Sequence, residues 1–102
     1  MRDIIEGICD ATKILDGSEN DNLHEFFVSK RNGLFTSIVI YDAVLTACKI
    51  NISSMGNADA VIDTSTSGVR IDLLYPIVGM NVSIKKTASM SAPSAYFKYL
   101  LF

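Results

Sequence analysis

The sequence predicts an α+β fold in which two or three N-terminal helices pack on one face of a small antiparallel sheet formed by the C-terminal half. Three observations predict it: helical spacing of apolar residues near the N-terminus, a turn-rich segment near the middle, and period-two alternation beyond it. The chain has 102 residues, 49% of them hydrophobic, and a net charge of -2. This composition favours one compact domain over residues 1–102.

The first expected helix covers residues 3–15, where apolar residues follow one helical stripe and charged residues follow the opposite one. Gly17 can adopt a positive φ after the last turn and is expected to end this helix. Asn22 followed three residues later by Glu25 approximates a capping box, which predicts the start of a second helix. Gly33 is expected to end that second helix.

Residues 34–50 fit two secondary structures. Their polar residues have helical spacing, whereas their β-branched and aromatic residues favour a strand. We expect mostly helix here, and the alternative is a strand over residues 35–41 followed by a shorter helix capped by Asp42. Residues 51–57 contain serines and a glycine and are expected to form a loop.

Two strands with period-two alternation, residues 69–75 and 78–84, are expected to form a hairpin. Pairing residues whose numbers sum to 153 places the apolar residues of both strands on one face. Residues 58–63 also alternate and are expected to fold back on this hairpin, with Asp63 opposite Arg70.

The chain ends in an apolar, aromatic segment, residues 96–102. Aromatic residues favour a strand with both faces covered, and a last helical turn is the alternative. We expect this segment to dock into the core of its own chain, and the alternative is that it covers a partner.

No motif indicates catalysis, so we expect no enzyme, no cofactor and no metal site. The only histidine is His24, and nothing beside it suggests a triad with a nucleophile. Cys9 and Cys48 are expected to be small, buried and reduced, and with one histidine they are too few for a structural zinc site. Residues 16–27 superficially resemble a calcium loop, but Phe27 stands where that loop needs a bidentate glutamate.

Charge is distributed unevenly along the chain. Residues 1–25 carry seven acids and two bases, a balance of -5, and residues 26–102 carry four acids and seven bases, a balance of +3. An acidic surface attracts a basic partner and repels nucleic acid, so we expect a basic protein partner and no nucleic-acid binding. The partner-binding acids are expected at loop and cap positions, which are Asp16, Glu19, Asp21 and Glu25.

These features favour a small acidic protein-binding protein, most concretely an immunity protein or antitoxin that occludes the active site of a basic, nuclease-type toxin. The first residues include acids where a signal peptide is apolar, and residues 34–50 are short and interrupted for a membrane span. We therefore expect a cytoplasmic protein with no membrane contact, present as a monomer or small homo-oligomer.

The alternative function belongs to another class. A structural or assembly subunit, such as a viral one, or a small secretion-type chaperone would self-associate through the apolar C-terminal strand.

Overall fold

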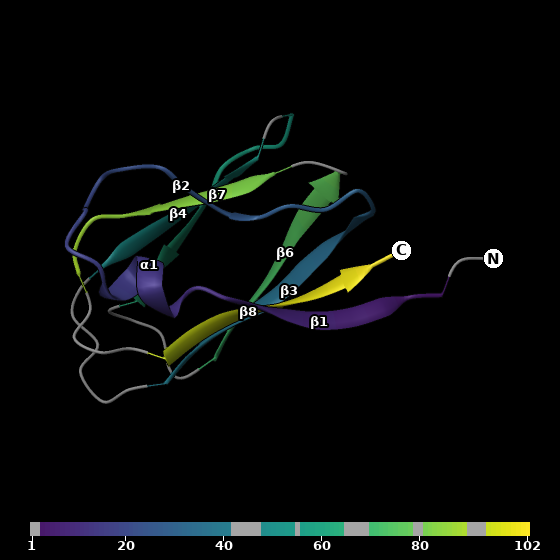
Figure 1. Cartoon of the computed structure of the whole chain (residues 1–102), viewed down its shortest axis with the longest axis horizontal. Coiled ribbons are helices and arrows are strands. Elements are labelled where there is room, and N and C mark those ends of the chain that lie inside the picture. The colour runs from purple at the N-terminus through teal and green to yellow at the C-terminus, as the bar shows by residue number, and fades with distance from the viewer. Residues whose placement is uncertain (1–2, 42–47, 55, 65–69, 79–80, 90–93) are drawn as a thin grey trace.

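The computed structural model describes residues 3–41, 48–54, 56–64, 70–78, 81–89 and 94–102 (Figure 1). Strands dominate these residues, and one short helix, α1 (Thr12–Asp16), lies between the first two strands. The strands are β1 (Ile5–Asp10), β2 (His24–Phe27), β3 (Asn32–Tyr41), β4 (Lys49–Ser54), β5 (Ala60–Asp63), β6 (Arg70–Val78), β7 (Val82–Lys86) and β8 (Ser94–Leu101).

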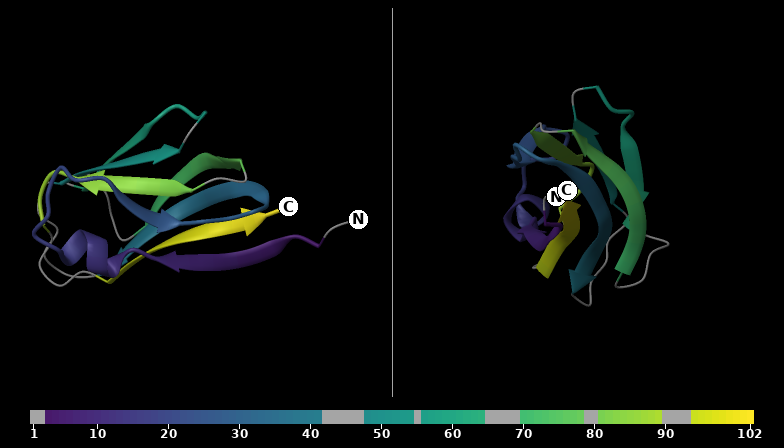
Figure 2. Two further views of the ribbon diagram at one scale, coloured as in Figure 1. Left: turned by 45° about the horizontal axis from the view of Figure 1, so that its top comes forward. Right: turned by 90° about the vertical axis from the view of Figure 1, so that its right-hand side faces the viewer.

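The strands form two antiparallel sheets. Sheet A has the order β1-β8-β3-β6 and sheet B has the order β2-β7-β4-β5. β1 pairs with β8, β2 with β7, β3 with β6 and β4 with β5, so the strand numbers of each of these pairs sum to nine. This order is that of an eight-stranded jelly roll. Figure 2 shows the two layers, with α1 at one end of the sandwich and both termini toward the other end.

The core lies between the two sheets and contains an aromatic cluster beside buried aliphatic side chains. The inner face of sheet A carries the buried rings of Phe35 and Phe97. A bulge in β2 lets two consecutive residues, Phe26 and Phe27, contact these rings, with centroid distances of 4.9 Å from Phe26 to Phe97 and 5.1 Å from Phe27 to Phe35. Both sheets also contribute buried aliphatic residues, which in sheet B are Ile50, Ile52, Ile62, Val82 and Ile84.

The α+β prediction is wrong, because the chain folds as a β-sandwich. Residues 3–15, predicted as one helix, form β1 and α1. The helical stripe contained Ile4 and Ile8, which are four residues apart; an even spacing also places two residues on one face of a strand. Isoleucine is β-branched and suits a strand better than a helix. α1 does end at Asp16, although Gly17 adopts an extended φ of -68° and not the positive φ expected of it.

The second predicted helix is also wrong, because its residues form β2 and the start of β3. The expectation of mostly helix over residues 34–50 is wrong, because β3 continues to Tyr41 and β4 begins at Lys49. The strand alternative for residues 35–41 is confirmed, and Asp42, the expected cap, lies outside the described residues. The predicted loop over residues 51–57 is strand β4 as far as Ser54. The buried isoleucines of β4 alternate with polar residues, and this period of two outweighs the turn propensity of its serines.

The hairpin prediction is half correct. β6 and β7 are strands, and both show the expected alternation between buried and exposed residues. They do not pair with each other, however, because β6 pairs with β3 in sheet A, whereas β7 pairs with β2 and β4 in sheet B. Asp63 lies opposite Lys49 and not opposite Arg70. Two residues of the predicted register, Val69 and Met80, lie outside the described residues.

The prediction for the C-terminal segment is confirmed. β8 lies between β1 and β3 and pairs with both, so it docks within its own chain. The described connection from α1 to β2, which contains Glu19 and Asp21, lies at the α1 end of the sandwich.

Candidate binding surface at the α1 end

The predicted acidic residues lie on and beside the connection from α1 to β2. Asp16 ends α1, Glu19 and Asp21 belong to the connection, and all three are exposed. Glu25 is also exposed, but it lies in β2 opposite Ser83, on the outer face of sheet B, where the side-chain amide of Asn81 donates to its carboxylate. The structure thus brings three of the four residues onto one segment and places Glu25 on an adjacent strand.

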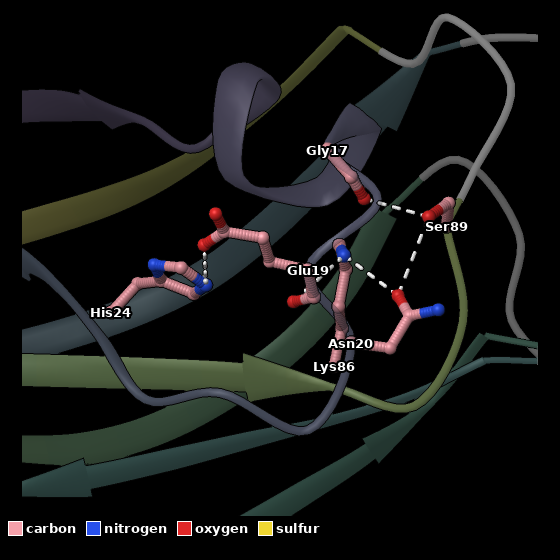
Figure 3. Close-up of polar contacts among 6 residues, drawn as sticks. All are labelled: Gly17, Glu19, Asn20, His24, Lys86 and Ser89. Carbon is pink, nitrogen blue, oxygen red and sulfur yellow. Dashed lines mark hydrogen bonds and ion pairs between the residues drawn. The ribbon is translucent and has the colours of Figure 1, made fainter.

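A buried lysine anchors this connection. Lys86 is only 1% exposed and occupies the inward-facing row of β7. Its ammonium group donates to Asn20 Oδ1 at 2.8 Å and to the carbonyl oxygen of Glu19 at 3.4 Å (Figure 3). In return the backbone N–H of Asp21 donates to the carbonyl oxygen of Lys86 at 2.7 Å. Three consecutive residues of the connection are therefore bound to one residue of β7.

Ser89 fixes the connection from a second direction. Its hydroxyl donates to the carbonyl oxygen of Gly17 at 2.6 Å and lies 3.3 Å from Asn20 Oδ1 (Figure 3). Asp21 adopts a positive φ of 63°, a left-handed conformation that aspartate tolerates better than most residues. Hydrogen bonds to residues distant in the sequence thus hold the main chain of the connection in place.

The acidic side chains remain at the surface of this fixed main chain. Glu19 Oε2 lies 3.7 Å from His24 Nε2, with side-chain exposures of 70% and 27%. The connection presents carboxylates to solvent while its backbone polar groups bond to the protein. This arrangement suits a charged docking surface rather than a catalytic site.

The expected acidic N-terminal helix does not exist, and its acids lie on another surface. Glu6 and Asp10 are exposed residues of β1, on the outer face of sheet A. Asp10 Oδ1 accepts the backbone N–H of Thr12 at 2.8 Å at the start of α1, and this hydrogen bond lowers the pKa of Asp10. The acids of residues 1–25 are therefore spread over sheet A, the α1 end and, with Glu25, the outer face of sheet B.

The cysteines are both free. Cys48 is buried, as expected, whereas Cys9 is half-buried, and its thiol donates to the carbonyl oxygen of Phe26 at 3.0 Å. Burial, together with the nearby negative charge of Asp10, raises the pKa of Cys9 to about 11, which leaves little reactive thiolate at neutral pH. Among the described residues, no group of three His, Cys, Asp or Glu side chains is arranged to hold a metal ion.

Sequence reasoning selected the acids but missed the residues that hold them. Lys86 continues the inward row of Val82 and Ile84, so extending the period-two pattern by one step would have identified it as buried. Asn20 and Ser89 carried no such signal, because their partners lie 66 and 72 residues away in the sequence.

Comparisons of the chain with protein-family models, curated proteins and solved structures gave no match. In the part of the chain that the structure describes, no helix has the length and apolar character needed to cross a membrane.

Proposed function

We propose that this protein is a binding module that docks on a basic protein through its acidic connection, Asp16 to Asp21, with Glu25 at the margin. One observation carries the proposal: the carboxylates are exposed, while the main chain beneath them is anchored by Lys86. The finer form of the proposal is an immunity protein or antitoxin, since the active site of a nuclease is cationic and a carboxylate-rich inhibitor would match its charge. The cell compartment in which the two proteins would meet is, on this proposal, the cytoplasm.

An anchored connection favours binding for a physical reason. Ordering a mobile loop on association costs free energy, and a segment that is already fixed avoids most of that cost. Long-range attraction between opposite charges also accelerates encounter, and salt weakens this attraction over a Debye length of ~8 Å at physiological ionic strength. Both effects act on affinity without any catalytic group.

The proposal can be tested with two variants of equal net charge. The first, Asp16→Asn/Glu19→Gln/Asp21→Asn, removes the charges of the connection and keeps an amide at each position. Asparagine also tolerates the left-handed conformation of Asp21. The control removes three exposed acids elsewhere on the protein, as Asp59→Asn/Asp63→Asn/Asp72→Asn.

Wild-type and variant proteins serve as baits for affinity capture from the native source, and the basic protein captured is then purified for binding kinetics. We expect the connection variant to associate ~10-fold more slowly at low salt, with a smaller difference at high salt, and the control to behave as wild type. Equal losses in both variants, or none in the first, would reject the connection as the docking surface. The antitoxin form is tested by measuring the nuclease activity of the captured protein with and without this protein bound to it.

A second candidate function, an assembly subunit, is favoured by a different observation. In the described part of the chain β1 is an edge strand of sheet A, and its outer edge pairs with no other strand. The C-terminal strand first considered for self-association has both edges paired within the chain, so assembly through its edges would need the sheet to open. The surface for assembly must therefore lie elsewhere.

A further inference from the structure

The four edge strands of the sandwich differ in how they are protected from pairing with another chain. β2 and β5 have only four residues each; β2 contains a bulge, and β5 ends in the exposed Asp63. β6 is longer but contains Pro76, which has no N–H to donate. β1 has six residues with no proline, no lysine and a register with β8 that shows no bulge. Its exposed acids, Glu6 and Asp10, are the only one of these protections that β1 has, so among the described edge strands β1 is the least protected.

The hydrogen bonds of β1 show which of its backbone groups point to the open side. The N–H of Ala11 donates to the carbonyl oxygen of Ala95 at 2.9 Å, so this pair is a hydrogen-bonded one. In an antiparallel ladder such pairs alternate with non-bonded ones, so Cys9, Gly7 and Ile5 direct their backbone groups toward β8. The backbone N–H and C=O groups of the alternate residues then point to the open side, and these residues are Glu6, Ile8 and Asp10.

We propose that a second copy of this chain pairs with β1 through its own β1, antiparallel, to form one continuous sheet of eight strands. The proposal gives the second candidate function its surface and rests on it, but it does not involve the acidic connection. The twofold axis of such a pair is perpendicular to the sheet, so the outer faces of both copies lie on the same side. Figure 2 shows β1 at the margin of its sheet, with no ribbon beyond it.

Overlap and charge together select one register for this pair, because sums of 14 and 16 pair the most residues of β1 and only one of the two avoids opposed acids. With matching faces, the numbers of opposed residues have an even sum. A sum of 12 places Glu6 opposite Glu6 of the second copy, and a sum of 16 places Glu6 opposite Asp10 of the second copy, so both registers oppose like charges. A sum of 14 places Glu6 opposite Ile8 of the second copy and Gly7 opposite Gly7 of the second copy, with no opposed acids. It also joins the outward-pointing backbone groups in hydrogen-bonded pairs.

The same register covers exposed apolar surface. Ile4 and Ile8 are 63% and 62% exposed. In the register of 14 the two Ile8 side chains become diagonal neighbours across the twofold axis, a separation that long side chains can bridge. Leu100 of β8 lies opposite Glu6 and extends this apolar surface toward the middle of sheet A on the same outer face. Self-pairing would therefore bury isoleucine side chains that otherwise contact water.

The first experiment measures self-association by analytical ultracentrifugation over a range of protein concentrations. Ile8→Pro removes an N–H that points to the second copy and leaves every hydrogen bond between β1 and β8 in place, so we expect the variant to fold. We expect its dimer dissociation constant to rise ~10- to 100-fold, because the pair loses hydrogen bonds. Ile8→Thr is the matched control, because it keeps the N–H and a β-branched side chain; we expect its dimer to persist. Circular dichroism checks folding, and Ile8→Lys replaces the proline variant if that variant unfolds.

The second experiment tests the register. Two single variants, Glu6→Cys and Ile8→Cys, are prepared separately and then mixed and oxidised. In the register of 14 these positions oppose each other at ~5.5 Å between Cα atoms, within the range of a disulfide. Each variant alone places its two cysteines roughly 8 to 9 Å apart, beyond that range. We expect a covalent dimer from the mixture and none from either variant alone.

The outcomes separate this proposal from the functions above. A dimer that Ile8→Pro does not weaken would overturn pairing through β1 and leave self-association in place through another surface. A protein that stays monomeric at the highest concentration reached would overturn both the β1 pair and the assembly function. A covalent dimer from the Glu6→Cys variant alone would overturn the register of 14. None of these results bears on docking of a basic protein at the acidic connection.

Discussion

The outer faces of the two sheets differ in the side chains that they present to solvent. Sheet B presents mainly polar residues, such as Asn51, Ser53 and Lys85, in its central strands. Sheet A presents Leu34 and Leu100 in its central strands. Among the described strand residues, the exposed large apolar side chains on the outer face of sheet A are Ile8, Leu74 and Val78, and on that of sheet B it is Val61. The outer face of sheet B is thus mainly polar, whereas the outer face of sheet A carries more exposed apolar side chains, which are typical of contact surfaces.

The aromatic cluster between the two sheets gives the largest expected effect on stability. Phe35 of sheet A is fully buried, and its ring contacts the rings of Phe26, Phe27, Phe97 and Tyr99. We expect Phe35→Ala to lower the free energy of unfolding by about 3–5 kcal/mol, because it removes these contacts and leaves a cavity. Urea unfolding followed by circular dichroism measures the change.

A much smaller change in the aliphatic part of the core is Ile52→Val in sheet B, which removes one methyl group from a fully buried side chain. We expect a loss of about 0.5–1.5 kcal/mol. If the phenylalanine variant lost no more than this, the aromatic cluster would not be the centre of the core.

The sequence pattern predicts the direction of side chains better than the pairing of strands. Alternation correctly indicated that Tyr75 and Ile84 turn inward. It did not indicate that their strands belong to different sheets, because a period of two carries no information about the neighbouring strand. The spacing of Ile4 and Ile8 fits either a helix or a strand, and only pairing with β8 decides between them.

The candidate site, like the fold, was predicted only in part. Charge alone selected Asp16, Glu19 and Asp21, and all three lie on one exposed connection. The anchoring of that connection depends on Lys86 and Ser89, which approach it only after the sandwich forms. Contacts between residues so distant in sequence leave no local pattern, so the acids could be predicted and their support could not.

Lys85 and Lys86, at the end of β7, allow a direct comparison of the outer and inner faces of sheet B. Lys86→Ala removes the donor to Asn20 and Glu19 and leaves space where a buried side chain stood, so we expect a loss of about 2–3 kcal/mol. Lys85→Ala, at an exposed position one residue earlier, should change stability by less than about 0.5 kcal/mol.

Thermal or urea unfolding measures both lysine variants. Hydrogen exchange adds a local readout, since the amide of Asp21 bonds to the backbone of Lys86 and should exchange faster once the side chain is lost. Equal stability of the two variants would mean that the buried lysine does not anchor the connection.

The smallest expected effect on stability tests whether the two outer faces differ in their capacity for contact. Leu74 in sheet A and Val61 in sheet B are 77% and 61% exposed. Leu74 lines a hollow of about 470 Å³ together with Thr36, Arg70, Asp72 and Leu73. Neither Leu74→Lys nor Val61→Lys removes buried contacts, so each should change the free energy of unfolding by less than about 0.5 kcal/mol.

The two lysine substitutions should nevertheless separate in the binding of an apolar fluorescent dye to the folded protein. We expect Leu74→Lys to reduce dye binding, because a charge then lies beside the hollow, and Val61→Lys to leave it unchanged, because Val61 is surrounded by polar residues of sheet B. If both variants reduced dye binding equally, the apolar side chains of sheet A would have no more capacity for contact than the one on sheet B. The contrast between the faces would then be one of composition alone.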